Sequence, residues 1–164
     1  MFRRILLAYD GSLEGAVALR EGALLAKRYG ASVFILSVIP ESTGVHLAES
    51  VHGGVIAHQM STYEEVLQRG IARLKQIGFE PTGKLVKGEP AREIGRYAHE
   101  VRADLVVVGH RQKSMLDRWW SGASGAYISD YLHCSLLMAR NVISDAEFEA
   151  ELRAAGASTG EDQA

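Results

Sequence analysis

The sequence predicts an α/β fold, a single doubly wound parallel sheet of five strands with helices on both faces. Short apolar runs alternate along the chain with longer amphipathic segments, which is typical of β-α-β units. The clearest run, residues 105–109 (LVVVG), is apolar throughout, as expected of a strand buried on both faces. A length of 164 residues, with 47% hydrophobic and 23% charged residues, fits one globular domain.

Local signals bound each expected element. Ser12 is a good N-cap for the first helix, Gly30 ends it, and Pro90 opens a later one. Two S-x-x-E capping boxes, Ser61–Glu64 and Ser144–Glu147, predict two further helix starts. We therefore expect strands over 5–9, 32–39, 84–87, 105–109 and 135–139, and helices over 13–29, 61–77, 90–101, 123–132 and 144–155.

The segment of residues 41–60 is predicted to be a long loop. It contains Gly44, Gly53 and Gly54, and connections of this length are uncommon in compact domains unless they are functional. It is therefore a candidate lid, and the helix that follows it could begin inside the loop.

Right-handed crossovers predict the strand order 3-2-1-4-5, counting strands along the chain. The first and fourth strands are then central neighbours, and ligands bind at such a switch point, beyond the carboxyl ends of the strands. The residues at those two ends are Asp10–Gly11–Ser12 and Gly109–His110–Arg111. The sequence thus predicts one crevice between them.

The composition limits the classes of function. We expect a domain over residues 1–142 and an acidic tail over 143–164, which carries six acidic residues and one basic residue. The last residues, 156–164, are expected to be disordered. A net charge of −2 gives no sign of a nucleic-acid partner. The single cysteine, Cys134, fits a reducing compartment. No signal peptide and no apolar run of about 20 residues is present, so we expect a cytoplasmic protein without a membrane span.

A phosphate cradle is predicted after Gly109. A polar loop leads to small residues, Ser121 to Gly125, which open the expected helix. The N–H groups at a helix N-terminus are unpaired and carry a positive partial charge, so they attract phosphate.

Several of these residues allow two interpretations. Asp10 could bind a ligand or be a solvated turn residue, and His110 with Arg111 could contact phosphate or form a polar loop. Trp119 and Trp120 could stack on a base, although adjacent aromatic residues more often pack in a core or an interface. Three histidines, His46, His52 and His58, recur every six residues, but this is no known zinc spacing, so metal binding is not expected. Cys134 has no paired base, so we expect it to begin a buried strand rather than to act as a catalytic thiol.

In combination, these motifs resemble the universal stress protein family. The resemblance rests on Asp10–Gly11–Ser12 after the first strand, Gly88–Glu89–Pro90, the strand of residues 104–109 and the distal Gly122. It covers about residues 1–140. It implies a Rossmann-like fold similar to that of adenine nucleotide alpha hydrolases. It further implies a cytoplasmic homodimer made under stress, which binds ATP or AMP and has no established catalytic reaction.

The resemblance also implies site residues. Asp10 would bond the ribose or the adenine, Val38 would touch the base, and glycines with Ser124 would line the phosphates. No metal is implied beyond the magnesium that accompanies a nucleotide. The nucleotide-binding set is Asp10, Gly11, Ser12, Val38, Val108, Gly109, Arg111, Gln112, Gly122, Ala123, Ser124 and Gly125.

Two other functional hypotheses stay open. The nucleotide-binding branch of the family carries G-x2-G-x9-G-[ST], and this chain has Gln112 and Ala123 at two of those positions, with Ser121 and Ser124 able to substitute. The first alternative is therefore a member that binds no nucleotide and acts through a protein partner. The second is an ATP-hydrolysing or nucleotidyl-transfer enzyme, whose S-G-G-x-D-S or H-x-G-H signature is missing. We expect a non-enzyme, with slow ATP hydrolysis at most incidental.

The fifth strand predicts a homodimer. Its sequence, SLLMA, is apolar, and an exposed apolar sheet edge is a hazard unless it is paired or covered. We expect pairing across a two-fold axis through Ser135, Leu136, Leu137, Met138, Ala139 and Arg140. The acidic tail helix could cap that edge, cover the partner, or only add solubility.

Overall fold

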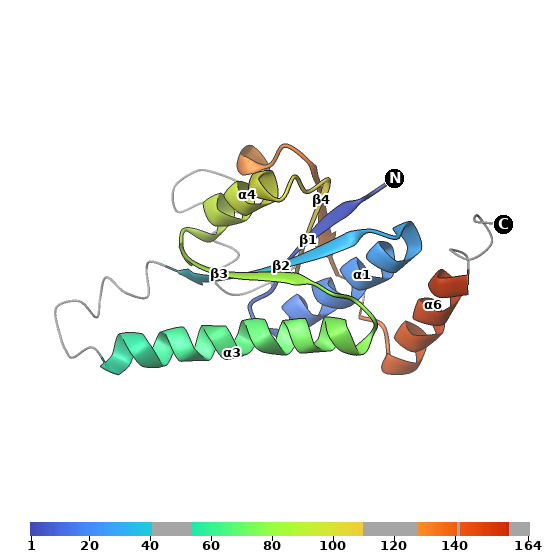
Figure 1. Ribbon diagram of the computed structural model, residues 1–164, viewed down its shortest axis with the longest axis horizontal. Helices are drawn as coiled ribbons and strands as arrows, with labels where there is room; N and C mark the ends of the chain where they lie inside the picture. Colours follow the sequence, from blue (N-terminus) through green and yellow to red (C-terminus); the bar gives the residue numbers. More distant parts are fainter. Residues whose placement is uncertain (41–53, 110–127, 141, 158–164) are drawn as a thin grey trace.

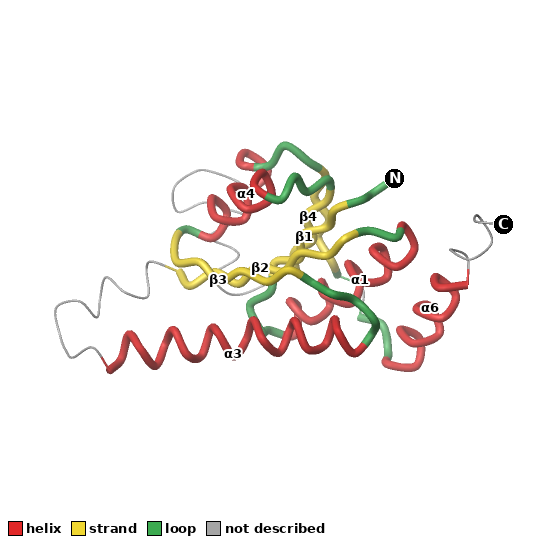
Figure 2. Tube along the Cα trace, in the orientation of Figure 1, coloured by secondary structure: helices red, strands yellow, loops and turns green. Residues whose placement is uncertain are grey.

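The predicted fold is confirmed. The computed structural model describes residues 1–40, 54–109, 128–140 and 142–157. Its five strands form one parallel sheet in the order β3-β2-β1-β4-β5 (Figures 1 and 2). The strands are β1 (Arg4–Ala8), β2 (Ser32–Pro40), β3 (Thr82–Gly88), β4 (Leu105–Gly109) and β5 (Ser135–Ala139).

Helices cover both faces of the sheet. α1 and α3 lie on one face, and α4 with a short 3-10 turn, η1, lies on the other (Figure 1). The helical elements are α1 (Leu13–Tyr29), α3 (Gly54–Gln76), α4 (Pro90–Glu100), η1 (Ile128–Tyr131) and α6 (Asp145–Ala157). None of those helices is long and apolar enough to cross a bilayer.

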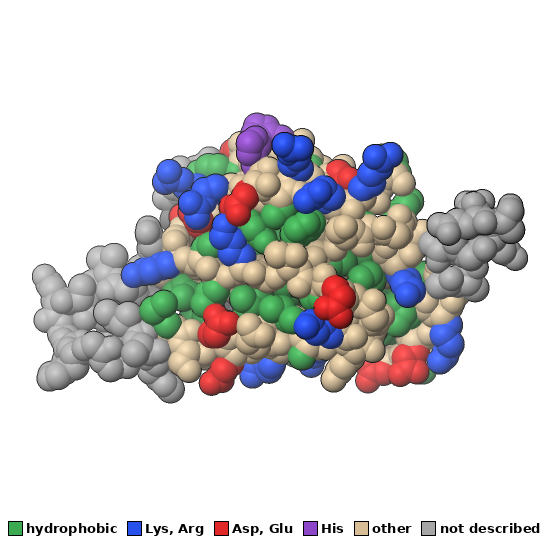
Figure 3. Space-filling model, viewed as in Figure 1, with side chains coloured by type: hydrophobic (Ala, Val, Ile, Leu, Met, Phe, Trp, Pro, Cys, Tyr) green, Lys and Arg blue, Asp and Glu red, His purple; other side chains and the backbone are tan. Residues whose placement is uncertain are grey.

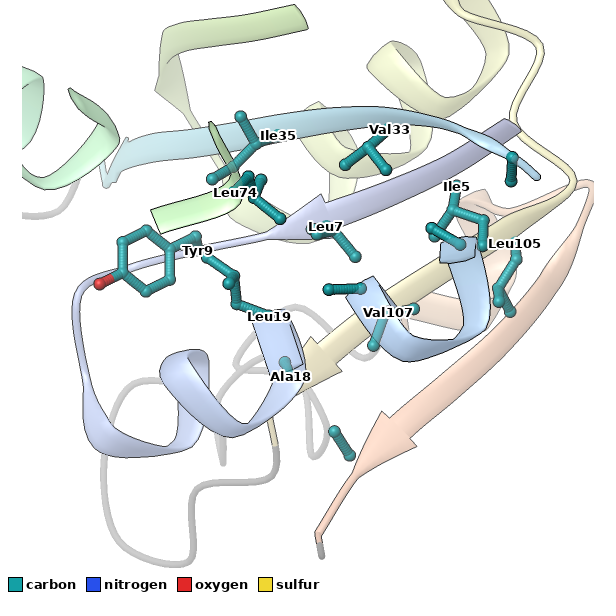
Figure 4. Close-up of a cluster of buried hydrophobic side chains, with 14 of the residues drawn as sticks. Ile5, Leu7, Tyr9, Ala18, Leu19, Val33, Ile35, Leu74, Leu105 and Val107 are labelled. Carbon is teal, nitrogen blue, oxygen red and sulfur yellow. The ribbon is translucent and has the colours of Figure 1, made fainter. Parts of the chain in front are cut away.

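Two apolar clusters hold these layers together. Figure 4 shows the cluster under α1 and α3, where alternate residues of β1 and β2, such as Leu7 and Ile35, meet Leu19 and Leu74 from the helices. The opposite residues of the same strands, such as Leu6 and Leu36, pack against Ile94 of α4. Since the central strands are buried on both faces, their sequences lack the alternation of a half-exposed strand.

Of the two starts expected for the third helix, the capping box at Ser61 was wrong, and the earlier start inside the loop of residues 41–60 is confirmed. α3 begins at Gly54, so the S-x-x-E motif lies inside the helix, where Glu64 accepts a hydrogen bond from Gln68 at 2.9 Å. No glycine or proline stands between Val55 and Arg69, so nothing in the sequence breaks the helix ahead of Ser61. Residues 41–53, the rest of the expected loop and lid, lie outside the described residues.

The predicted helix over 123–132 was wrong within its described part. Ile128–Tyr131 is a single 3-10 turn, and Leu132 N–H donates to Ser129 C=O at 3.3 Å. The turn cannot propagate because the chain must reach β5 at Ser135 only a few residues later.

The acidic helix α6 packs on α1, beside the sheet (Figure 1). Arg20 of α1 forms an ion pair with Asp145, donates to Ile143 C=O at 3.1 Å and lies 5.4 Å from the ring centroid of Phe148. Phe148 is buried against this guanidinium. These contacts indicate that the tail helix covers α1, a role that is not among the three expected from the sequence.

The capping box Ser144–Glu147 is confirmed as the start of α6. Ser144 N–H and Oγ–H both donate to Glu147 Oε2 at 2.8 Å, and Glu147 N–H donates to Ser144 Oγ at 3.2 Å. The backbone and side-chain hydrogen bonds from Ser144 lower the pKa of Glu147.

We predict that the capping box makes the stability of α6 depend on pH. Because the folded pKa of Glu147 is depressed, its stabilising effect is present above the unfolded pKa and is lost as the pH falls through the folded value. Amide hydrogen exchange at Phe148 should therefore accelerate, relative to the intrinsic rate, on acidification. Glu147→Gln should flatten this dependence, while Glu151→Gln on the exposed side of α6 should keep it. An unchanged profile in Glu147→Gln would contradict the assignment.

Candidate functional site

The carboxyl ends of β1 and β4 lie side by side at the centre of the sheet. The two strands pair directly, with Leu7 opposite Val107. The chain just after β1 is held by β2, because Tyr9 N–H donates to Leu36 C=O at 2.9 Å and Ser37 Oγ–H donates to Tyr9 C=O at 2.7 Å. Ser37 is fully buried, so this bond is shielded from water. The position of Asp10 is thereby fixed by the sheet.

Asp10 and Ser12 build the N-terminal cap of α1. Asp10 Oδ1 accepts hydrogen bonds from Ser12 N–H, at 3.0 Å, and from Ser12 Oγ–H. Ser12 Oγ in turn accepts from Gly15 N–H at 3.0 Å, which confirms the predicted N-cap. Gly11 between them has φ +79°, a conformation that favours glycine. The aspartate therefore has a structural role alongside any role in binding.

Gly109 meets the same cap from the other strand. A Cβ at Gly109 would lie 2.4 Å from Glu14 C=O oxygen and 2.9 Å from Gly15 N. The end of β4 and the first turn of α1 are therefore in backbone contact, and Gly109 does not have positive φ. Its absence of a side chain is required by this packing rather than by a turn.

Helix α3 borders the site on the face that it shares with α1. A Cβ at Gly11 would touch both methyl groups of Val66, at 3.0 and 3.1 Å, and would lie 3.7 Å from Arg69 Nη2. Burial, and then the negative charge of Asp10, raises the pKa of Tyr63. Sequence reasoning missed this wall, although Tyr63, Val66 and Gly70 at intervals of three and four continue the apolar face of α3.

The two valines of the predicted site belong to the opposite face. Val38 near the end of β2 is half-buried, and Val108 in β4 is buried; both pack in the cluster under α4. The side chain of Val108 is thus directed into the core.

The phosphate end of the predicted site lies outside the described residues. The neighbouring candidates His110, Trp119 and Trp120 also lie outside them. From the predicted set, the structure brings together Asp10, Gly11, Ser12 and Gly109. The members outside the described residues are Arg111, Gln112, Gly122, Ala123, Ser124 and Gly125.

The predicted dimer strand, β5, is an edge strand that pairs with β4 alone in this sheet. Leu136 and Met138 contact the cluster under α4, and Leu137 contacts the cluster under α1. All three are only half-buried within the single chain.

Within the described ranges, no group of three or more His, Cys, Asp or Glu side chains could hold a metal ion. His46 and His52 lie outside these ranges, as does the side chain of His58. Among the described residues, the polar groups near the two strand ends include the Asp10 carboxylate, the Ser12 hydroxyl and the Arg69 guanidinium, a set suited to hydrogen bonding with a polar ligand.

A match to a family model establishes how the chain is related to known proteins. The model of the universal stress protein family matches residues 1–140. The chain belongs to this family. Its C-terminal helix, α6, begins beyond the matched region.

Relatives of this universal stress protein occur in archaea and bacteria. A universal stress protein of Methanocaldococcus jannaschii is 25% identical over 141 residues, covering 85% of this chain and 83% of the relative. The Bacillus subtilis universal stress protein YxiE is 29% identical over 152 residues, covering 85% of this chain and 100% of the relative.

Solved structures share the fold. The universal stress protein of Archaeoglobus fulgidus has a TM-score of 0.64 at 20% identity, covering 85% of this chain and 100% of that chain. A universal stress protein solved in complex with cAMP has a TM-score of 0.58 at 20% identity, covering 85% and 97%. The A. fulgidus protein in complex with dAMP has a TM-score of 0.61 at 18% identity, covering 85% and 98%.

We predict that Gly109→Ala destabilises this universal stress protein by about 2 kcal/mol, because the added methyl group overlaps the backbone of Glu14 and Gly15. Gly88→Ala is the matched control at the end of β3. There the nearest atoms to the new Cβ belong to the side chain of Glu93, at 2.7 to 3.1 Å, and a side chain can shift where backbone cannot, so the cost should be smaller than at Gly109. Urea unfolding of both variants measures the difference, and equal costs would contradict the backbone contact.

Proposed function

We propose that this universal stress protein binds an adenine nucleotide, ATP or AMP, reversibly in the crevice between the ends of β1 and β4. The proposal includes no bond-breaking step. The observation that carries it is the placement of Asp10 and Gly109 at neighbouring strand ends, at the switch point of a doubly wound sheet. Ligands of such sheets bind at that point because the loops diverge there.

Asp10 is well prepared to accept hydrogen bonds from a nucleotide. Ser12 fixes the orientation of its carboxylate through Oδ1, so little side-chain freedom would be lost on binding. In this proposal the carboxylate accepts a hydrogen bond from a ribose hydroxyl or the adenine amino group. The half-buried Val38 would contact the base.

The fold supports the choice of ligand class. Two proteins of the same fold were solved with cAMP and with dAMP. Both ligands are adenine nucleotides, so a sheet of this topology can hold an adenine ring, a ribose and at least one phosphate.

The alternative function is a partner-binding module without a small ligand. Gln112 and Ala123 favour it, because a glycine and a hydroxyl at those positions would let phosphate reach the backbone and donate to it. Under this alternative the protein would act in the stress response through its surfaces.

Nucleotide binding is tested with Asp10→Asn. This variant keeps an oxygen that can accept from Ser12 and so preserves the arrangement of the cap, whereas Asp10→Ala would also remove the acceptor that orients Ser12. We expect calorimetry to detect ATP or AMP binding to the wild type and about tenfold weaker binding to Asp10→Asn, since a hydrogen bond to a charged group is lost. Glu80→Gln, at an exposed position on the loop after α3, should bind as the wild type does.

Two results would contradict the nucleotide proposal. One is the absence of heat with ATP, ADP and AMP, together with no adenine nucleotide in the supernatant of the freshly purified, denatured protein. The other is unchanged affinity in Asp10→Asn. The first would favour the partner-binding alternative, and the second would move the site away from β1.

We further propose a cytoplasmic homodimer formed through β5. The unpaired edge of β5 and its half-buried Leu136, Leu137 and Met138 support it. Val142 just beyond the strand is 85% exposed in the single chain and would extend the same apolar surface.

The dimer is tested by sedimentation velocity over a wide range of concentrations. We expect a dimer for the wild type and a shift toward monomer in Val142→Lys, which adds a charge to the surface without disturbing the core. Met60→Lys, at an exposed apolar position on α3, should remain dimeric. A wild-type protein that sediments as a monomer throughout would exclude the proposal.

A further inference from the structure

Three helices end in the same hydrogen-bonded motif, and one of them lacks the expected glycine. In this motif the residue after the cap adopts positive φ, and the next N–H bonds back to a carbonyl five residues earlier. The closing bonds are Ala31 N–H to Ala26 C=O at 2.8 Å in α1, Phe79 N–H to Leu74 C=O at 3.0 Å in α3, and Ala103 N–H to Ala98 C=O at 2.8 Å in α4.

The residue with positive φ differs among the three helices. It is Gly30 in α1, with φ +60°, and Gly78 in α3, with φ +90°. In α4 it is Arg102, with φ +51°, the one non-glycine residue with positive φ in the described ranges. An arginine in this conformation is sterically disfavoured relative to glycine. The fold alone would be served better by glycine, so the side chain of Arg102 calls for a reason of its own.

Arg102 lines a surface pocket of about 290 Å³ at the C-terminal end of α4. Gly95, Ala98 and Ala103 form an apolar wall. A Cβ at Gly95 would lie 2.5 Å from Tyr131 C=O oxygen, so η1 approaches α4 closely beside the pocket. The remaining lining residues are His99, His133 and Cys134.

Three exposed polar side chains, those of His99, Arg102 and His133, line this pocket, and none of them has a protein acceptor among the described residues. The rings of His99 and His133 lie edge to face, 6.2 Å apart. In the part of the chain that the structure describes, neither imidazole nor the Arg102 guanidinium has a hydrogen bond or ion pair. Figure 3 shows histidine side chains over the α4 end of the molecule with Lys and Arg side chains beside them.

Nearby acidic groups are engaged elsewhere. Glu100 of α4 forms an ion pair with Lys84 at 2.6 Å, and Glu93 forms one with Arg96. Asp104 accepts hydrogen bonds from the N–H groups of Arg3 and Arg4, at 2.8 and 3.1 Å. No carboxylate lines the pocket among the described residues.

The thiol in the pocket adds no charge. Burial, and then the negative charge of Asp104, raises the pKa of Cys134, so the thiol remains protonated at neutral pH. A neutral thiol does not repel an anion and contributes a polarizable, largely apolar surface.

The negative end of the α4 dipole is also occupied. The N–H groups of Arg102 and Ala103 bond to carbonyls of the last turn, and Arg4 Nε–H donates to Val101 C=O at 2.5 Å. The carbonyls of Ala98, His99 and Val101, which would oppose an anion, therefore already have donors, one of them cationic.

We propose that this pocket binds a small phosphate monoester, with Arg102, His99 and His133 as donors to the phosphate oxygens. A phosphate monoester has three terminal oxygens, which match a guanidinium fork and two separate imidazoles. A carboxylate has two oxygens and would leave a donor unused. The apolar wall takes a compact uncharged body, and the volume is near the lower limit, about 300 Å³, of small-molecule sites.

This second site is separate from the nucleotide crevice. It lies next to residues 103 and 134, which precede β4 and β5, whereas the crevice lies beyond the carboxyl ends of the strands. The two sites are therefore at opposite ends of the sheet.

The test uses phenyl phosphate and inorganic phosphate as probes on the full-length protein, followed by two-dimensional amide NMR. We expect saturable shifts at Gly95, Ala103 and His133, with phenyl phosphate binding more tightly than inorganic phosphate, and none from benzoate or phenol. Arg102→Gly should bind phenyl phosphate about tenfold more weakly or worse, since its charged donors are lost. Its melting temperature should be equal or higher, because glycine suits the positive φ.

Two further variants sharpen the test. Arg92→Gln removes an exposed cation from α4 away from the pocket and should bind as the wild type does. His99→Gln combined with His133→Gln should weaken binding while Arg102 remains.

The proposal is overturned if phenyl phosphate causes no saturable shifts at the pocket. It is also overturned if Arg102→Gly binds as tightly as the wild type, or if Arg92→Gln loses as much affinity, which would indicate general surface charge. Binding of a phosphoserine peptide without binding of phenyl phosphate would exclude a small-molecule site and indicate a protein ligand. A marked fall in the melting temperature of Arg102→Gly would assign the arginine to the fold.

Discussion

The contact between Gly109 and the first turn of α1 determines how close the two central strand ends can lie to the helix cap. Asp10, Ser12 and Gly15 form that cap, and Gly109 rests on its backbone. A Cβ at Gly15 would itself lie 2.6 Å from Asp10 Oδ1, so the cap depends on the absence of side chains at two places. These close backbone approaches fix the relative positions of the two strand ends and the start of α1. Packing and ligand access therefore constrain the same few residues.

The sequence predicted the sheet well because local signals and tertiary packing agree there. β5 has the predicted bounds, α1 begins after Ser12 and ends before Gly30 as expected, and the strand order follows from handed crossovers. The errors lie where a local motif had no tertiary support. Ser61–Glu64 has the composition of a capping box, but a motif of that kind caps a helix only where the preceding chain leaves helical geometry.

The candidate site could be predicted only in part from the sequence. Asp10 and Gly109 follow from strand ends, which hydrophobic runs mark clearly. The wall formed by Tyr63, Val66 and Arg69 depends on the angle at which α3 crosses the turn after β1, and no local pattern encodes that angle. The docking of α6 through Arg20 was hidden for the same reason, since an arginine in the middle of a helix looks like any solvated cation.

The two proposed sites stand in opposite relations to stability. At the crevice, Asp10 and Gly109 serve the fold, so their presence is explained even without a ligand, and only a substitution that preserves the cap can separate the two roles. At the amino end of the sheet, Arg102 occupies a backbone conformation that Gly30 and Gly78 adopt in the equivalent motifs with no steric conflict. Packing explains the crevice residues and leaves Arg102 unexplained. A residue that stands where the backbone prefers glycine is the stronger indication of a function at its side chain.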